Sequence, residues 1–283
     1  METAILLIQC PDQKGIVAKI SDFVFRKSAN IIRSDQYSTD PQDGVFFMRL
    51  EFCFDPAILQ KTILEHDFGI LAQTLGALWK IHYRSTRMRM GILVSKLDHC
   101  LVDILYRCNS GELELDIPCI LSNHPDLEAI ARNYSIPFYH VPVTKDNKVH
   151  AEKVLLSHLN GTTDFIVLAR YMQVLSSDFL NSYNGDIINI HHSFLPSFKG
   201  ADPYRQAYDR GVKIIGATAH YVTAELDEGP IIDQSVERVS HKDDIAILKR
   251  KGKHLEKTTL ANAIMAHSEH RVIKFRNKTI LFD

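Results

Sequence analysis

The stretch NIHHSFLPS, residues 189–197, begins inside an apolar run and is followed by a second short stretch, LDEGP, at residues 226–230. From residue 90 onward, similar apolar runs alternate with amphipathic segments. This alternation predicts a doubly wound, mostly parallel α/β sheet, in which ligands bind beyond the carboxyl ends of the strands. Asn189 and His191 stand at one such end, so we expect a functional site there.

Three side chains in these two stretches suit attack on an acyl carbon. The amide of Asn189 can hold a developing oxyanion. The imidazole of His191 can move protons near neutral pH. The carboxylate of Asp227 can orient the imidazole or a water molecule and set its basicity. This chemistry requires no serine or cysteine nucleophile, so the sequence predicts direct attack by an amine or by water.

The rest of this region supplies the expected strands and helices of the sheet. A short, polar and basic segment, residues 85–89, is the expected linker before it. A long helix over 243–268 and a final strand over 272–281 are expected to close the chain. Strands are predicted at 90–94, 117–121, 138–141, 165–169, 187–191 and 214–222, and helices at 97–107, 125–134, 148–159 and 203–209.

The first 85 residues predict a separate, smaller domain. Apolar runs at 3–9, 31–39, 45–54 and 78–83 indicate strands, and a turn over 40–44 joins the second and third of them. Helices are expected from residue 16 and over 55–75. The order βαββαβ is a ferredoxin-like plan. We therefore divide the chain into residues 1–85 and 86–283.

Composition limits the partners and the compartment. The chain has 283 residues and a formal net charge of −1, which gives no electrostatic attraction to nucleic acid or to an anionic membrane. No apolar run approaches the roughly 18 residues of a membrane span, and the start METAILLIQCPDQ does not resemble a signal peptide. Five scattered cysteines are typical of free thiols in a reducing cytoplasm.

The NIHxS…LPSFKG segment followed by LDEGP resembles the folate-dependent formyltransferase family. The doubled histidine, the run GATAHYV at residues 216–222 and the segment LDEGPII resemble its deformylase branch most closely. The resemblance implies a catalytic trio of Asn189, His191 and Asp227. It also implies hydrolysis of 10-formyltetrahydrofolate to formate and tetrahydrofolate, which supplies formate for purine synthesis and balances the one-carbon folate pools.

The same resemblance implies where the folate binds. The run LARYMQVL, residues 168–175, corresponds to the segment that lines the pterin pocket in the family, although Gln173 stands where members often have arginine. The first turn of the larger domain, SKLDHC at 95–100, has no glycine and carries Asp98, which disfavours a phosphorylated acceptor. The implied folate-binding residues are Met172, Gln173, Val174, Leu175, Ala224, Glu225 and Leu226.

The opening PDxxGIVAKIS, residues 11–21, resembles an ACT domain, a regulatory module that often binds small amino acids. The resemblance implies an effector site at Asp12, Gly15 and Ile16, with glycine or methionine as candidates. A simple strand-to-helix turn is the alternative. A module of this size leaves sheet edges to cover, so a homo-oligomer is expected.

No metal or other cofactor is expected. A metal site built from His191, His192 and His220 is conceivable, but neither an HExxH nor a Cys-x-x-Cys pattern is present. Two other functions remain open. A formyltransferase to an amine acceptor would use the same trio, and a non-catalytic amino-acid-binding regulatory protein would not need the trio intact.

Overall fold

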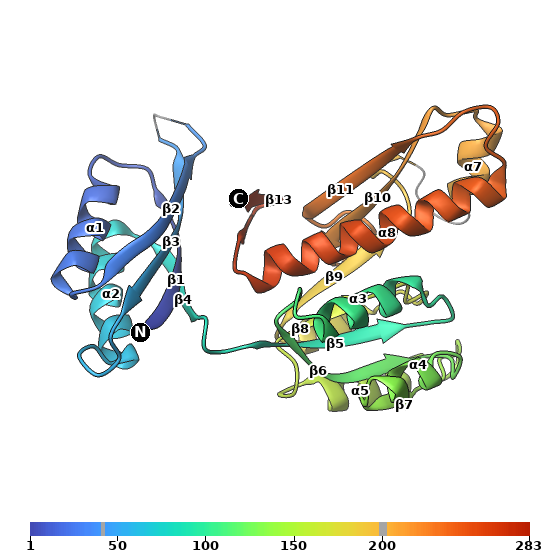
Figure 1. Ribbon diagram of the computed structural model, residues 1–283, viewed down its shortest axis with the longest axis horizontal. Helices are drawn as coiled ribbons and strands as arrows, with labels where there is room; N and C mark the ends of the chain where they lie inside the picture. The colour runs from blue at the N-terminus through green and yellow to red at the C-terminus, as the bar shows by residue number, and fades with distance from the viewer. Residues whose placement is uncertain (41–42, 198–202) are drawn as a thin grey trace. The chain divides into compact units, whose positions relative to one another are not determined.

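The computed structural model describes residues 1–40, 43–197 and 203–283, and the chain forms two compact units (Figure 1). Part of the turn expected over 40–44 and the end of the LPSFKG segment lie outside the described residues. None of the helices in the described part of the chain has the length and apolar character that a membrane crossing requires.

The first unit is an antiparallel sheet with the strand order β2-β3-β1-β4 and two helices on one face (Figure 1). Its element order agrees with the βαββαβ order expected from the sequence. Ile16, Ile20 and Val24 recur at helical spacing and bury one side of α1 in the core. The elements are β1 (Glu2–Pro11), α1 (Ile16–Arg26), β2 (Asn30–Ser38), β3 (Val45–Phe54), α2 (Lys61–Leu75) and β4 (Leu78–Tyr83).

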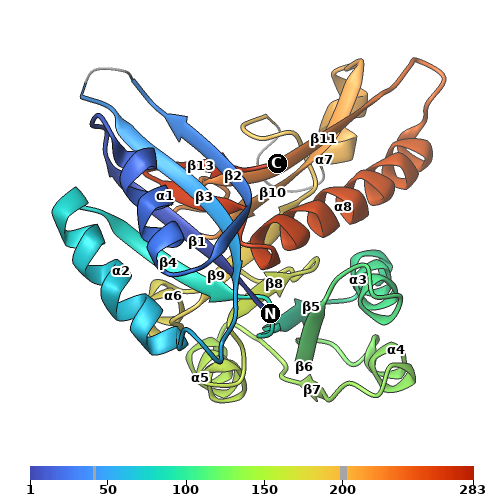
Figure 2. The same ribbon diagram turned by 60° about the vertical axis from the view of Figure 1, so that its left-hand side comes forward.

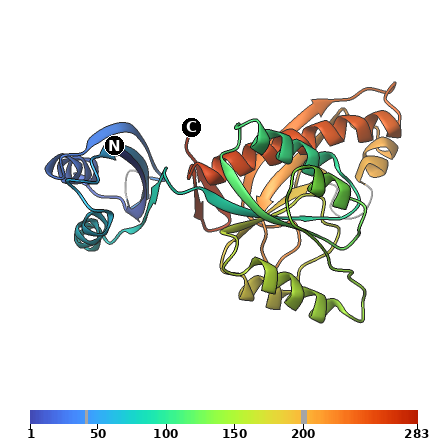
Figure 3. The ribbon, with the colours of Figure 1, turned by 60° about the horizontal axis from the view of Figure 1, so that its bottom comes forward.

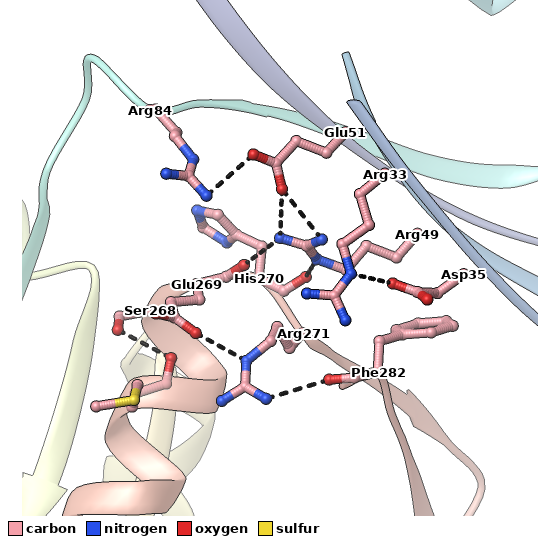
Figure 4. Close-up of polar contacts among 11 residues, drawn as sticks. Arg33, Asp35, Arg49, Glu51, Arg84, Ser268, Glu269, His270, Arg271 and Phe282 are labelled. Atoms are coloured by element: carbon pink, nitrogen blue, oxygen red, sulfur yellow. Dashed lines mark hydrogen bonds and ion pairs between the residues drawn. The ribbon is translucent and has the colours of Figure 1, made fainter. Parts of the chain in front are cut away.

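The C-terminal end of the chain also belongs to this first unit. Arg49 of β3 donates hydrogen bonds to the backbone carbonyls of Glu269 (3.2 Å) and His270 (3.1 Å) (Figure 4). The ring of Phe47 packs edge-on against Phe275, with ring centroids 5.1 Å apart. From the sequence, all of residues 86–283 were expected to form the second domain. The contacts instead group Glu269–Phe275 and Ile280–Asp283 with the N-terminal residues.

The second unit is a seven-stranded sheet with the order β11-β10-β9-β8-β5-β6-β7. Strands β7, β6, β5, β8 and β9 run parallel, whereas β10 is antiparallel to β9 and β11, so the prediction of a mostly parallel α/β sheet is confirmed. Figure 3 shows helices on both faces of this sheet. The strands are β5 (Met88–Val94), β6 (Leu115–Ser122), β7 (Phe138–His140), β8 (Phe165–Leu168), β9 (Asp186–His191), β10 (Ile214–Tyr221) and β11 (Ile231–Arg238).

One long helix covers the β9–β11 side of the sheet. This helix, α8 (Ile245–Ser268), packs along β9, β10 and β11 (Figure 2) and also contacts α3 and α7. The residues after it form a short hairpin of β12 (Val272–Phe275) and β13 (Lys278–Leu281), where the sequence predicted one strand over 272–281. The other helices are α3 (His99–Asn109), α4 (Glu128–Asn133), α5 (Lys148–Leu159), α6 (Ser177–Ser182) and α7 (Pro203–Asp209).

Candidate active site

The end of β9 supplies two of the predicted trio because this strand lies between two buried neighbours. Leu168 of β8 pairs with Asn189 on one side, and His220 of the antiparallel β10 pairs with it on the other. Asn189 is half-buried and His191 is buried. Both side chains therefore stand at the carboxyl edge of the parallel sheet, where α/β sheets bind ligands.

The structure brings the three predicted residues together and adds a fourth. Nδ1 of His191 lies 3.3 Å from Oδ2 of Asp227. Nε2 of His220 lies 3.7 Å from Oδ1 of Asp227 and 3.2 Å from Nδ2 of Asn189. The sequence analysis named His220 only as a conceivable metal ligand. The pairing of β10 with β9 places His220 opposite Asn189, and this register cannot be deduced from the sequence alone.

A tight turn aims Asp227 at the two imidazoles. Asp227 has a φ of 57°, in the left-handed region that Asp adopts more readily than most residues. The turn closes with a hydrogen bond from the backbone N–H of Tyr221 to the carbonyl of Pro230, 2.9 Å. A Cβ on Gly229 would lie 1.8 Å from the carbonyl oxygen of Tyr221, so only glycine fits there.

The hydrogen bonds define how the protons are arranged. The ring of His220 donates from Nδ1 to the carbonyl of Tyr221 (2.9 Å), so its neutral Nε2 accepts from the amide of Asn189. His191 donates from Nδ1 to Asp227, which leaves its Nε2 as the buried atom without a partner among the described residues. An unpaired buried nitrogen is available to a substrate or a water molecule.

Asp227 is ionised at neutral pH in this site. Burial opposes its ionisation, but the hydrogen bond from His191 favours it, and its pKa lies well below the usual value of an aspartate. His192 behaves in the opposite way. Burial, with the nearby charge of Arg170 and His191, lowers the pKa of His192 to about 4, so its ring is neutral at pH 7.

The implied folate-binding residues lie in two loops beside the trio. Met172 is 58% exposed, Val174 56% and Leu226 60%. Leu175 is buried in the core under β8, and the backbone N–H of Met172 donates to Oγ of Ser95 (2.9 Å). Gln173 is half-buried, while Ala224 and Glu225 are exposed in the loop that leads to Asp227.

The residues implied for an effector site lie in the first unit around the start of α1. Gly15 has a φ of 88° and precedes the helix. Asp12 is half-buried and accepts a hydrogen bond from Oγ of Ser38 (2.5 Å). The side chain of Ile16 is buried in the core, so only its backbone can contact a ligand.

A second polar cluster lies next to His192 and was missed by the sequence analysis. Glu256 of α8 is 1% exposed and accepts a hydrogen bond from the hydroxyl of Tyr204 (2.6 Å). Its other oxygen lies 2.7 Å from Nε2 of His99 and 3.4 Å from Nε of Arg170. These residues are far apart in the sequence, so only the fold reveals the cluster.

Within the described residues, the group of ligand-type side chains close enough to hold a metal ion is His99, Cys100 and Glu256. Burial raises the pKa of the Cys100 thiol well above its usual value. Glu256 is already bonded to His99 and faces the cation of Arg170.

The sheet and the trio at its edge define a class of protein. The model of the family described as formyl transferase matches residues 88–264. The glycinamide ribonucleotide transformylase 1 of Symbiobacterium toebii is 29% identical, with a TM-score of 0.65, over 71% of this chain and 97% of that one.

Other relatives match both units. The formyltetrahydrofolate deformylase of Synechocystis sp. is 50% identical over 99% of this chain and 98% of that protein. The Bacillus subtilis formyltetrahydrofolate deformylase is 46% identical over 98% of this chain and 93% of that protein. The crystal structure of the Burkholderia mallei formyltetrahydrofolate deformylase has a TM-score of 0.93 and 41% identity, over the whole of both chains. The chain therefore belongs to the formyltetrahydrofolate deformylase family.

Proposed function

We propose that this protein is a hydrolase that converts 10-formyltetrahydrofolate and water into formate and tetrahydrofolate. The convergence of Asn189, His191 and Asp227 at one sheet edge carries the proposal. The near full-length similarity to formyltetrahydrofolate deformylases supports the choice of substrate. The formate released is proposed to supply purine synthesis, and the reaction to balance the one-carbon folate pools.

The two exposed loops are proposed to hold the folate. The apolar side chains of Met172, Val174 and Leu226 offer a surface for a flat aromatic ring. Backbone groups of the run from Met172 to Leu175 would read the edge of the pterin, with Gln173 in place of an arginine contact. The loop of Ala224, Glu225 and Leu226 would contact the folate from the side that carries Asp227.

The chemical step is proposed to run through Nε2 of His191. This atom is the unpaired buried nitrogen of the site, and Asp227 holds the ring in the tautomer that leaves it free. A water molecule held by Asp227 and His191 attacks the formyl carbon and gives its proton to Nε2. The oxyanion that forms is stabilised by the amide of Asn189 and by the imidazolium of His191.

Collapse of the tetrahedral intermediate breaks the bond between carbon and N10. The proton stored on His191 moves to N10 as tetrahydrofolate leaves, and formate remains. His220 keeps one N–H of Asn189 engaged, which directs the other N–H at the reacting oxygen. One oxyanion donor contributes about 10²–10³ in rate, and a positioned acid–base group about 10²–10⁴.

Release of formate from 10-formyltetrahydrofolate, with no amine added, tests this function. The expected result is stoichiometric formate and tetrahydrofolate. Formyl transfer that occurs only when an amine is supplied would instead favour a formyltransferase, and the absence of both reactions would favour a non-catalytic protein. The proposed mechanism uses no metal or other cofactor.

The first unit is proposed to be an ACT-type regulatory domain. Its βαββαβ order and the glycine at the start of α1 support this assignment. A small amino acid such as glycine or methionine would bind near Asp12 and Gly15, and the domain would contribute contacts to a homo-oligomer. The five free cysteines support a location in the reducing cytoplasm.

A further inference from the structure

Arg170 has a backbone conformation that glycine normally takes. It follows β8 with a φ of 65°, in the left-handed region where a bulky side chain is uncommon. The preceding residue is fixed by a hydrogen bond from the N–H of Ala169 to the carbonyl of Leu93, 2.9 Å. The chain therefore keeps a long cationic side chain where glycine would remove the strain, which indicates a role for the side chain itself.

Glu256 holds this side chain in place. Both side chains are more than nine-tenths buried, and Nε of Arg170 lies 3.4 Å from Oε2 of Glu256. Burial opposes ionisation of Glu256, but His99, Arg170 and Tyr204 outweigh it and hold its pKa below the usual value. A Cβ on Gly252 would lie 1.9 Å from the hydroxyl of Tyr204, so this glycine lets the ring reach the carboxylate.

The cluster of Arg170, Glu256, His99 and Tyr204 extends to the candidate active site through His192. The ring of His192 lies 5.9 Å from that of Tyr204 and 5.2 Å from that of His191. The cluster is buried and charged, whereas the loops proposed to bind folate are exposed and apolar. The cluster therefore lies on the His192 side of the candidate active site.

We propose that Arg170, held by Glu256, is a specificity-determining residue that closes the acceptor side of the site so that water is the acceptor. This inference rests on the hydrolysis proposed above. An amine would need the volume that the four side chains fill, and it would disrupt the hydrogen bonds of His99 and Tyr204 with Glu256. A primary amine is also largely protonated near pH 7, so the fixed charge of Arg170 repels it. Water is small and neutral and avoids both obstacles.

The two outcomes differ only in the attacking atom. In hydrolysis, the oxygen of water bonds to the formyl carbon, the bond to N10 breaks, and the proton passes through His191 to N10. In transfer, the nitrogen of the amine bonds to the same carbon and its proton takes the same route. The ratio of formylated amine to formate therefore measures the selectivity of the acceptor side.

The test supplies 10-formyltetrahydrofolate together with glycinamide, whose amino group is partly uncharged at about pH 8. Formate and formylglycinamide are measured by mass spectrometry, and an enzyme-free blank is subtracted. Wild type is expected to give formate alone. Arg170→Gly removes the side chain and relieves the backbone, and the amount of formylglycinamide is expected to reach at least about tenfold the detection limit, which wild type does not exceed.

Ser135→Gly is the matched control because Ser135 also has a positive φ, 57°, and is exposed in the turn after α4. It is expected to give formate alone. Arg170→Lys keeps the charge and is expected to stay near wild type. If Arg170→Gly fails to fold, Arg170→Ala serves instead, since it removes both the volume and the charge of the side chain. Formate as the only product from the folded Gly or Ala variant overturns the inference, whereas no formate from wild type would refute the proposed hydrolysis instead.

Discussion

At the residue scale, the site depends on one ionised carboxylate between two imidazoles. Asp227 keeps its charge despite its burial because it accepts a hydrogen bond from His191. It also selects the tautomer of His191 that leaves Nε2 free. The role of Asp227 is therefore electrostatic as well as geometric, and its charge can be removed without changing its shape.

Asp227→Asn tests the charge alone. The amide keeps the size of the side chain, so the melting temperature and folate binding are expected to stay close to wild type. The imidazolium of His191 would lose its counter-charge, and kcat is expected to fall by about 10²–10⁴. Glu228→Gln changes the next carboxylate in the same turn and is expected to keep kcat near wild type. A near wild-type rate for Asp227→Asn would leave Asp227 as a turn residue only.

The lowered pKa of His192 predicts how the stability of the folded protein changes with pH. Its folded pKa of about 4 lies below the unfolded value of about 6.5, so the unfolded chain binds the additional proton between these values. This contribution to stability is complete above pH ~6.5 and is lost as the pH falls toward ~4. The melting temperature of His192→Gln is expected to fall less over this range than that of wild type. Equal slopes for the two proteins would contradict a half-buried, neutral His192.

At the element scale, the sequence predicted best the elements with strong periodicity. The central strands β5, β6, β8 and β9 are buried on both faces and therefore appear as continuous apolar runs. Strand β11 was missed because it is a half-exposed edge strand with few apolar residues. The final strand was predicted as one, whereas a two-residue turn of Arg276, with a φ of 56°, and Asn277 divides it into β12 and β13.

Some residues of the candidate site could also be predicted from the sequence, and others could not. Asn189, His191 and Asp227 lie in two short stretches whose residue types already suit acyl chemistry. Arg170 and Glu256 meet only because α8 packs over the sheet edge at which β8 ends, and no local pattern carries that information. Long-range polar contacts of this kind depend on the tertiary fold, so reasoning from local sequence does not find them.

The packing of α8 against Tyr204 can be tested at Gly252. Gly252→Ala would place a methyl group 1.9 Å from the hydroxyl of Tyr204, so the ring or the helix must move. The expected loss is about 1–3 kcal/mol of unfolding free energy. Gly69→Ala in α2 is the matched control because its methyl would make an ordinary 3.5 Å contact, and it is expected to stabilise by up to about 1 kcal/mol. Equal effects in thermal melts would argue against close packing at Gly252.

At the scale of the whole molecule, the first unit is built from both ends of the chain. Arg49 is 3% exposed, bonds the carbonyls of Glu269 and His270, and pairs with Glu51 at 3.4 Å (Figure 4). A fragment that ends at residue 268 would remove these carbonyl partners. The C-terminal segment is therefore part of the N-terminal unit's structure, which a division of the chain at residue 85 alone does not capture.

Arg49→Ala measures how much this arrangement contributes. Removing one partner of a buried pair is expected to destabilise the first unit by on the order of 3 kcal/mol. The single tryptophan of the chain, Trp79, lies in β4, so its fluorescence reports unfolding of that unit. Arg33→Ala is the control, since its pair with Asp35 is largely exposed and is expected to contribute at most about 1 kcal/mol. Equal shifts in the denaturant midpoint would contradict the account.

The central claim is that Asn189 and His191 serve one transition state. The most direct test measures formate release by Asn189→Ala, His191→Ala and the double variant under saturating 10-formyltetrahydrofolate. Each single change is expected to lower kcat by at least about 10². The double variant is expected to lose far less than the product of the two single losses, because groups that act as a unit are not additive. Losses that multiply fully would show that the two residues act independently and would contradict the account.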